Sequence, residues 1–436
     1  MQIHSNPSKS IKNLKYFMST FIINGGRKLT GSVKISGAKN AATPILAATL
    51  LTRQVCTIKR VPRIKDVEKM LAILASLGAS VKWTGPDTVR VDTSKTSTKS
   101  LNTGLVKSMR SSILLLGPML ALFKQVSTTE PGGDIIGRRP IDTHLDAFAQ
   151  LGVTTSLRGE RFILRGEKLK SAMVTLKEFS VTASENAIMA AVLLSGITTI
   201  KMAANEPHVQ DLISFLNKAG AKISWLDSHT IKIKGVKKLH GTTHTVIPDQ
   251  IEIGTLAVAA GLTKGKIRMK PVVPEHLESI VLKLKQIGFK INLGKDYMVV
   301  DGSGPLKAFK FQSLPYPGLP TDLQAPFTVL ATACKGESLI HDPMYEGRLG
   351  HVSQLVKMGA QATICDPHRV IVNGPKRLNG REFPSLDIRA GATMVLAGLA
   401  ARGTTTIHQA EIVERGYENF EGRLRKLGAK IKKVDD

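Results

Sequence analysis

Fifteen residues from Glu130 to His144 combine the residue types that bind an anion. The stretch holds three glycines, two prolines, two arginines and two aspartates, so it is too broken for a helix or strand and too charged for a core. Pro131-Gly-Gly favours a turn with positive φ, and Arg138 and Arg139 bring guanidinium groups to a predicted helix start near Asp142. We interpret it as a mobile loop that handles an anion, the alternative being a solvated surface loop.

Charged residues also stand where predicted apolar helices begin, although a purely structural helix would need none there. At the helix starts these are Lys39, Arg110, Glu185, Glu252, Asp322 and Arg389, and in the strand-to-helix loops they are Arg63, Arg139, Glu206, Glu275, Arg348 and Arg415. If pseudo-symmetry brings the two sets together, they line a cleft suited to a substrate with phosphate and carboxylate groups. For any single residue, a solvated cap or a surface ion pair is the alternative.

One unit of about 70 residues, which occurs six times, must position these side chains. In each copy an amphipathic helix ends at a glycine, as a left-handed helix C-cap requires, and a strand follows. The capping glycines are Gly78, Gly152, Gly220, Gly288, Gly359 and Gly428.

Each unit also contains a second helix that is apolar nearly all round and must therefore be buried. These helices are predicted at 40–51, 109–122, 184–195, 251–262, 323–334 and 388–401, and short strands follow at 56–58, 126–128, 198–200, 266–268, 338–340 and 405–407. The second unit has the longest loop: it spans 28 residues from Lys124 to its capping glycine, against 23 to 25 in the others. Insertions in single repeats often carry function, so the extra length favours a functional role for the loop at 130–142.

Composition limits the classes of protein that remain. A chain of 436 residues with 42% hydrophobic content can bury large cores in two or three domains. The apolar run 111–123 is interrupted by Gly117 and Pro118 and is shorter than the roughly 20 residues of a membrane span. The net charge of +27 suits nucleic acid, acidic membrane surfaces or phosphorylated small substrates, but aromatic residues at 5% are too few for nucleic-acid stacking.

The three cysteines predict neither a disulfide framework nor a metal cluster, because Cys56, Cys334 and Cys365 are odd in number and far apart. That favours a cytoplasmic location. Residues 1–17 contain no acid and are expected to be a disordered extension, with a start at Met18 or a targeting peptide as alternatives.

Nucleotide-binding glycine motifs, a nucleophile elbow and a zinc motif are all absent from the sequence, so we expect carboxylates and cations to do the chemistry without a cofactor. The histidines near amphipathic-helix starts are predicted to cap those helices. They are His144, His208, His276 and His351.

Six motifs of the chain are specific enough to indicate a family. They are Ser36-Gly-Ala-Lys-Asn-Ala-Ala42, Met109-Arg-Ser-Ser112, Pro131-Gly-Gly-Asp-Ile-Ile-Gly-Arg-Arg-Pro-Ile-Asp142, Pro320-Thr-Asp-Leu-Gln324, Asp387-Ile-Arg389 and Glu414-Arg-Gly-Tyr-Glu418. Together they closely resemble the UDP-N-acetylglucosamine enolpyruvyltransferase family, from about Met18 to the C-terminus.

The resemblance implies an inside-out α/β barrel fold in two domains, built from the six units, with substrates in the cleft between the domains. Domain I is expected at 18–38 plus 248–436, and domain II, which carries the active-site loop 130–142, at 39–247. The implied reaction moves the enolpyruvyl group of phosphoenolpyruvate to the 3′-hydroxyl of UDP-N-acetylglucosamine and releases phosphate, the first committed step of peptidoglycan synthesis. No cofactor, metal, nucleic acid, membrane or oligomer is implied.

The resemblance also implies site residues. Phosphoenolpyruvate would be held by Lys39, Arg139 and Arg415, with Asn40, Arg110, Arg348 and Arg389 nearby. The UDP-sugar would be lined by Asn40, Arg110, Arg139, Pro140, Ile141, Asp142, Thr143, Ser180, Val181, Asp322 and Met344.

The resemblance implies four catalytic residues, Lys39, Asp134, Asp322 and Arg415, of which the two carboxylates would transfer the protons. Asp322 fits the base that takes the proton of the sugar hydroxyl, while C3 of the enol must be protonated at the other end of the double bond. In the family the acid on the loop is usually cysteine, and here that position is Asp134. Nearby arginines favour the ionised carboxylate, whereas closure over phosphoenolpyruvate excludes water and adds negative charge, which favours the protonated form. We therefore expect Asp134 to act as an acid only in the closed complex.

The aspartate has a consequence for fosfomycin, the epoxide that alkylates the family's cysteine thiolate. A carboxylate is a far weaker nucleophile, so the chain should turn over in the presence of the drug. Two other departures are Glu346-Gly-Arg348 for the family's Glu-Asn-Arg, and Ser180-Val-Thr182 for Ser-Val-Gly. They put sugar contacts in question but remove no charge that the mechanism needs.

Three alternative functions are open. The sister enzyme 3-phosphoshikimate enolpyruvyltransferase shares the fold, but the Ala-Lys-Asn motif and the Pro-Gly-Gly-Asp loop argue against it. RNA 3′-phosphate cyclase shares the repeated unit, and its RNA binding would fall steeply with salt. A catalytically silent binding scaffold is suggested by Asp134 and Gly347.

Overall fold

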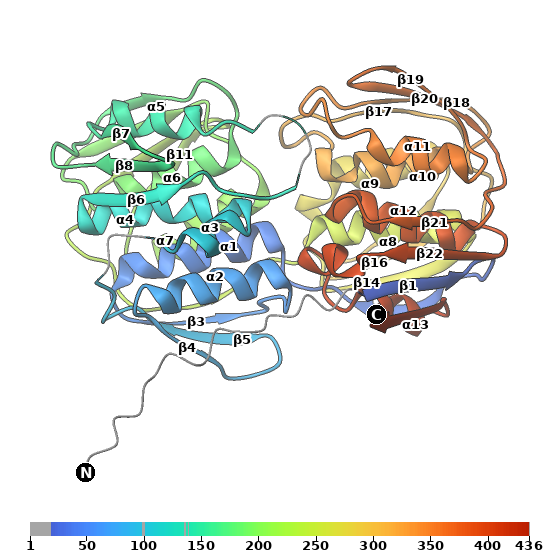
Figure 1. Ribbon diagram of the computed structural model, residues 1–436, viewed down its shortest axis with the longest axis horizontal. Coiled ribbons are helices and arrows are strands. Elements are labelled where there is room, and N and C mark those ends of the chain that lie inside the picture. The colour runs from blue at the N-terminus through green and yellow to red at the C-terminus, as the bar shows by residue number, and fades with distance from the viewer. Residues whose placement is uncertain (1–18, 98–100, 135–136, 138, 436) are drawn as a thin grey trace, which may run out of the picture.

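Two hydrophobic cores lie side by side, each made of buried helices wrapped by small sheets (Figure 1). The computed structural model describes residues 19–97, 101–134, 137 and 139–435, so the predicted extension at 1–17, Met18 and Arg138 lie outside the described residues. One core runs from Ala38 to Val246, and the other joins Phe21–Ile35 to Ile251–Ile431. These cores support the domain boundaries expected from the resemblance, and we propose domain II for the first and domain I for the second.

Three sheets cover the core of domain II. Their strand orders are β13-β3-β5-β4, β6-β8-β7 and β11-β12-β10-β9 in the described part of the chain. The strands are β3 (Val55–Lys59), β4 (Ser80–Trp83), β5 (Thr88–Asp92), β6 (Gln125–Thr129), β7 (Thr154–Arg158), β8 (Arg161–Arg165), β9 (Met173–Thr175), β10 (Ile197–Lys201), β11 (Lys222–Asp227), β12 (Thr230–Lys234) and β13 (Thr243–Thr245).

Three more sheets cover domain I, with the orders β21-β22-β1-β23, β15-β16-β14-β2 and β17-β18-β20-β19. The strands are β1 (Ser19–Asn24), β2 (Thr30–Lys34), β14 (Lys266–Lys270), β15 (Lys290–Leu293), β16 (Met298–Asp301), β17 (Lys310–Gln312), β18 (Gly336–His341), β19 (Gln361–Asp366), β20 (Arg369–Gly374), β21 (Glu382–Pro384), β22 (Thr404–His408) and β23 (Lys430–Asp435). Because β1 pairs with both β22 and β23, the N-terminal strand is built into the C-terminal half.

The predicted buried helices are present, one in each unit. They are α1 (Lys39–Ala48) with η1 (Thr49–Thr52), η2 (Arg110–Leu115) with α4 (Leu116–Phe123), α6 (Val181–Ala191), α8 (Gln250–Leu262), η4 (Thr321–Leu323) with α10 (Gln324–Ala331), and α12 (Ile388–Ala400). The short strands predicted after them are β3, β6, β10, β14, β18 and β22. Helices inside and sheets outside confirm the predicted fold class.

The amphipathic helices lie between the buried helices and the surface, and each ends as the sequence predicts. They are α2 (Lys65–Ser76), α5 (Asp142–Gln150), α7 (Pro207–Lys218), α9 (Glu278–Ile287), α11 (Gly350–Lys357) and α13 (Phe420–Lys426), while α3 (Thr103–Lys107), η3 (Pro274–His276) and η5 (Ala410–Arg415) are short connecting turns. All six predicted capping glycines have φ between +92° and +120°. A side chain there would be strained, which explains why glycine marks every unit.

The chain crosses between the domains twice, and the two crossings are joined. The backbone N–H of Ala38 donates to the carbonyl of Ile247 at 2.8 Å, and that of Asp249 donates to Ser36 at 3.0 Å. The crossings thus form one hydrogen-bonded hinge. Among the described residues, no helix has both the length and the apolar character needed to span a membrane.

Candidate active site

Four charged side chains meet where the two domains face each other. Lys39 begins α1, and its Nζ lies 2.6 Å from Oδ2 of Asp66 in the first turn of α2. Arg415 ends η5 in domain I, and its Nε lies 3.1 Å from Oδ1 of Asp66. The Asp134 carboxylate of the loop binds Nη1 of the same arginine. Arg415 therefore joins two carboxylates of domain II to domain I.

The start of α1 adds to the anion-binding character of this cluster. Its N-cap residue, Ala38, provides no side-chain hydrogen bond to the helix. The first N–H groups of a helix point away from it and carry partial positive charge, so an uncapped helix start can bind an anion beside the Lys39 ammonium. Asn40, the second helical residue, is exposed at this end.

Electrostatics hold Asp66 in its ionised form. Burial raises the pKa of this carboxyl, but Lys39 and Arg415 outweigh that effect and leave the pKa below its usual value. The Asp66 side chain is only 3% exposed, so water screens these interactions little. Asp66 thus fixes where the two cations point.

A second ionic cluster surrounds Asp322. Its Oδ1 lies 2.7 Å from Nη2 of Arg348, and its Oδ2 lies 2.8 Å from Nη2 of Arg389. Burial raises the pKa of Asp322, but the two guanidinium groups hold it well below the usual range. Arg389 also lies 5.0 Å from the Tyr417 ring, and its Nη1 is buried with no hydrogen-bond partner among the described residues. The Asp322 carboxylate and the Tyr417 ring thus fix the orientation of the Arg389 guanidinium.

The two clusters lie on either side of Asp387, the N-cap of α12. Burial raises the pKa of this carboxyl, while Arg348 from one cluster lowers it and Asp134 from the other raises it. The loop also approaches domain I at Gly137, where an added Cβ would lie 2.7 Å from Oε2 of Glu346. With φ at +112°, Gly137 fits this close contact in a way that a larger residue would not.

Arg110 holds the base of the loop. Its Nη2 donates to the carbonyls of Arg139 and Pro140, the latter at 3.2 Å. Burial, and then the charge of Arg139, lower the pKa of Arg110 to about 10, so it stays cationic at neutral pH. Helix α5 begins at Asp142, as predicted.

Comparisons with known proteins agree with this architecture. The family model for EPSP synthase (3-phosphoshikimate 1-carboxyvinyltransferase) matches residues 23–424. UDP-N-acetylglucosamine 1-carboxyvinyltransferase from Bradyrhizobium diazoefficiens is 42% identical over 95% of this chain and 98% of that protein, and the enzyme of this name from Bdellovibrio bacteriovorus is 41% identical over 95% and 100%. The chain belongs to the UDP-N-acetylglucosamine 1-carboxyvinyltransferase family.

Solved structures place the fold in the same group. The enolpyruvyl transferase NikO from Streptomyces tendae superposes with a TM-score of 0.87 at 25% identity, over 96% of this chain and 100% of that one. An EPSP synthase from Acinetobacter baumannii has a TM-score of 0.74 at 19% identity, over 96% and 100%, and shares the fold alone. The higher identity to the UDP-N-acetylglucosamine 1-carboxyvinyltransferases separates this chain from the sister enzyme.

The UDP-sugar residues implied by this family lie around the loop base and on both domains. Thr143 is buried and donates to Glu178 at 2.9 Å, and Ser180 caps α6, which starts at Val181. Ile141 is buried at the N-cap of α5, while Pro140, Asp142 and Met344 are exposed. Their contact with a sugar nucleotide remains a prediction.

Thr182, where the sequence departs from the family's pattern, forms a hydrogen bond with His144. Asn186 donates to Nδ1 of His144 at 3.1 Å, which leaves the proton on Nε2 to donate to Oγ1 of Thr182, also at 3.1 Å. Burial, and then Arg110, lower the pKa of His144 to about 3, so it is neutral. The expectation that His144 caps a helix was wrong, because its ring is buried against α6.

Some predicted charges do not join the site. Arg63 stacks on Trp83 at 3.9 Å, and Glu252 pairs with Arg423 inside domain I. Burial raises the pKa of both Glu185 and Glu206, and the charge of Glu206 raises that of Glu185 further, while the backbone of Tyr316 in domain I hydrogen-bonds Glu206. The convergence predicted from the repeats therefore holds for only part of the set.

The sequence reasoning missed Asp66. An acid in the first turn of an amphipathic helix usually just complements the helix dipole, so nothing local distinguished it. The only available signal was its place in the first unit, directly after the loop that carries Arg63. Among the described residues, no group of three or more histidine, cysteine, aspartate or glutamate side chains could hold a metal ion.

Proposed function

We propose that the chain transfers the enolpyruvyl group of phosphoenolpyruvate to the 3′-hydroxyl of UDP-N-acetylglucosamine with release of phosphate, the first committed step of peptidoglycan synthesis. The observation that carries the proposal is the meeting of Lys39, Asp134 and Arg415 between the domains, beside the Asp322 cluster. It supplies cations for an anionic substrate and a carboxyl group at each end of a reacting double bond.

Lys39, Arg139 and Arg415 would bind the phosphate and carboxylate of phosphoenolpyruvate. Arg415 binds the carboxylates of both Asp66 and Asp134, so the substrate must replace at least the Asp134 contact. Asp66 stays in place, since it is buried and also binds Lys39. It would act as a positioning residue that presents both cations to the substrate.

Asp134 would supply the proton to C3. In the structure its carboxylate is held by Arg415, so Asp134 must leave this ion pair before it can act. When the phosphate takes over Arg415, the carboxyl loses its cation and gains an anionic neighbour, both of which favour protonation. Loss of a proton from C3 in the elimination step would return the proton to the same group.

Asp322 would accept the proton of the sugar hydroxyl. Its two guanidinium partners make it a weak base in the substrate-free site. Both arginines are cationic and lie beside the proposed phosphoenolpyruvate site, so a bound trianion would draw them away and strengthen the base. The addition joins the hydroxyl oxygen to C2, and phosphate then leaves from C2.

Phosphate release tests this function. It should require both phosphoenolpyruvate and UDP-N-acetylglucosamine and should yield one phosphate for each enolpyruvyl sugar nucleotide. Release that depends on shikimate 3-phosphate instead, or no release with either acceptor, would contradict the proposal. The three cysteines are unpaired, as a cytoplasmic protein would have them, and that location remains a prediction.

A further inference from the structure

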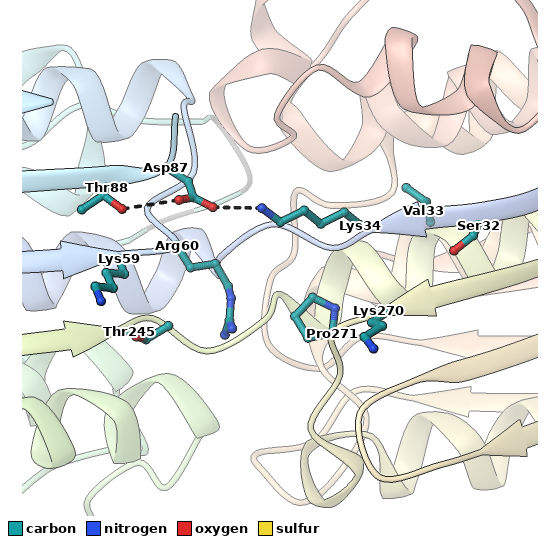
Figure 2. Close-up of a pocket in the computed structure, with 10 residues that line it drawn as sticks. All are labelled: Ser32, Val33, Lys34, Lys59, Arg60, Asp87, Thr88, Thr245, Lys270 and Pro271. Atoms are coloured by element: carbon teal, nitrogen blue, oxygen red, sulfur yellow. Dashed lines mark hydrogen bonds and ion pairs between the residues drawn. The ribbon is translucent and has the colours of Figure 1, made fainter. Parts of the chain in front are cut away.

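A cavity of about 570 Å³ lies beside the hinge and is separate from the ionic clusters of the active site (Figure 2). Both domains line it: Lys59, Arg60 and Thr245 belong to domain II, and Lys34 and Lys270 to domain I. Its volume falls within the range of about 300 to 1,000 Å³ typical of small-molecule sites. None of the residues that line the cavity belongs to the ionic clusters around Asp66 and Asp322.

Parallel strand pairs from each domain end at this cavity. In domain I, β2 pairs in parallel with β14, and their last residues, Lys34 and Lys270, are register partners. In domain II, β13 pairs in parallel with β3, and Thr245 is the register partner of Lys59. The carboxyl ends of parallel strands are a recurrent place for ligands in α/β proteins. Here two such ends face each other and carry cations on both sides.

The lining has an excess of positive charge. Four cations, Lys34, Lys59, Arg60 and Lys270, share the cavity with one carboxylate, Asp87. Lys34 crosses from domain I to bind Asp87 at 3.0 Å, as the dashed line in Figure 2 shows. Lys270 is paired with Asp296, which lies outside the lining, at 3.1 Å. Lys59 and Arg60 form no ion pair with the described residues, so domain II contributes two cations without a direct carboxylate partner.

Arg60 is fixed in place rather than loosely solvated. It is half-buried, and its Nη1 donates to the carbonyl of Val246 in the second crossing at 2.9 Å. Its backbone is in the left-handed region at φ 53°, and Gly37 of the first crossing packs so closely that a Cβ would lie 1.8 Å from the Arg60 carbonyl oxygen. The second crossing therefore holds the guanidinium at the cavity, and the first packs against the Arg60 backbone.

We propose that this cavity binds a small molecule carrying a diphosphate group, and that the ligand bridges the two domains at the hinge. A diphosphate offers anionic oxygens in two directions, so one phosphate can meet Lys59 and Arg60 while the other meets Lys34 and Lys270. A single phosphate would satisfy only one side. Hydroxyl groups of Ser32, Thr88 and Thr245 are further donors on the lining.

The bridge would couple to domain closure. Lys59 and Arg60 on one domain face Lys34 and Lys270 on the other, and a bound diphosphate would offset the repulsion that remains among these cations beside the Lys34–Asp87 and Lys270–Asp296 ion pairs. A ligand that contacts both domains favours the arrangement in which both contacts form. Binding should therefore slow the opening of the crossings at 33–38 and 244–250.

Inorganic pyrophosphate is the probe for the full-length chain, titrated by calorimetry at low ionic strength. Replacing one cation on each side, in the variant Lys59→Ala/Lys270→Ala, should weaken this binding by about tenfold or more, since charge-assisted hydrogen bonds from both domains are lost. The matched control Lys290→Ala/Lys310→Ala removes two exposed lysines elsewhere in domain I and should change affinity less than about twofold.

The variant Lys39→Ala separates this site from the active site, because it should lose any pyrophosphate bound there and keep the hinge site. Hydrogen exchange of the amides at 33–38 and 244–250 should slow with pyrophosphate in the wild type and in the control pair, but not in Lys59→Ala/Lys270→Ala. Equal weakening in both lysine pairs, equally tight binding of inorganic phosphate, or complete loss of binding in Lys39→Ala would overturn the proposal. None of these measurements depends on turnover, so they fail or succeed independently of the proposed function.

Discussion

Replacing Asp134 by asparagine separates proton delivery from binding. The amide keeps the shape of the carboxyl group and can still accept a hydrogen bond from Arg415, but it cannot carry the proton to C3. Loss of a general acid lowers kcat by about 10² to 10⁴, or about 3 to 5 kcal/mol in activation free energy. We expect a fall of that size in Asp134→Asn.

Folding should change little in the same variant. Arg415 keeps its contact with Asp66 at 3.1 Å, so no cation is left without a carboxylate. The lost pair is 17% and 18% exposed at its two side chains and joins a surface loop to η5. We therefore expect a loss of about 1 kcal/mol in unfolding free energy, or a fall in Tm of about 1 to 2 °C for a chain of this length.

Phosphate release at saturating concentrations of both substrates measures the effect, with thermal unfolding in parallel. Asp146→Asn, on α5 just after the loop, is the matched control. Asp146 pairs with the exposed Lys177 and accepts a hydrogen bond from Gln150, neither of which belongs to the ionic clusters, so this variant should keep full activity. Asp134→Cys should restore turnover, since a thiol can also donate a proton. More than a tenth of wild-type kcat in Asp134→Asn, with Tm preserved, would refute the assignment of Asp134 as the acid.

Three further outcomes are expected. Fosfomycin should neither inactivate the wild type over time nor add mass at Asp134, whereas Asp134→Cys should show both effects by mass spectrometry and activity. Asp322→Asn should lose activity and about 3 to 5 kcal/mol of unfolding free energy in denaturant titrations, because two nearly buried guanidinium groups lose their carboxylate; a fully stable or active variant would contradict this. Burial lowers the pKa of His144 to about 3 and that of His351 to about 4 in the folded chain. In the unfolded chain both histidines bind a proton as the pH falls below about 6.5, so acid favours the unfolded state. Each histidine should then lower the unfolding free energy by up to about 1.4 kcal/mol per pH unit, until the pH reaches its pKa in the folded chain. In His144→Gln, the unfolding free energy should fall less steeply with decreasing pH.

Local signals in the sequence predicted the fold well. A glycine that must take positive φ at the end of an amphipathic helix is visible from a few residues, and all six predicted caps have that conformation. The buried helices were visible because they are apolar on every face. The sequence predicts the start of these helices to within a few residues at Lys39 and Asp322. A charged residue directly before an apolar run marks the point where the helix leaves the core.

The contacts within the site were less predictable because they join distant residues. Arg415 and Asp66 are 349 positions apart, and no pattern within either segment reveals that they meet. Conversely, Arg63 and Glu252 occupy repeat positions equivalent to those of site residues, but they have partners within their own domains. Arg63 stacks on Trp83, and Glu252 forms an ion pair with Arg423. Pseudo-symmetry predicts where a charge stands along its unit, whereas the partner depends on which neighbouring unit faces it.

Arg415 connects the loop, the domain interface and the chemistry. Asp66 binds it from α2 whatever the loop does, while Asp134 binds it only when the loop lies across the interface, so the arginine has one permanent and one exchangeable carboxylate. Under the proposed function, the phosphate of phosphoenolpyruvate would compete for the exchangeable position alone. The displacement that admits the substrate would then release the carboxyl group that must become protonated, and this would tie the readiness of the acid to the presence of phosphoenolpyruvate. A thiol at position 134 would carry less charge in the resting state and compete less for Arg415, so the aspartate makes substrate binding and acid activation more strongly coupled steps.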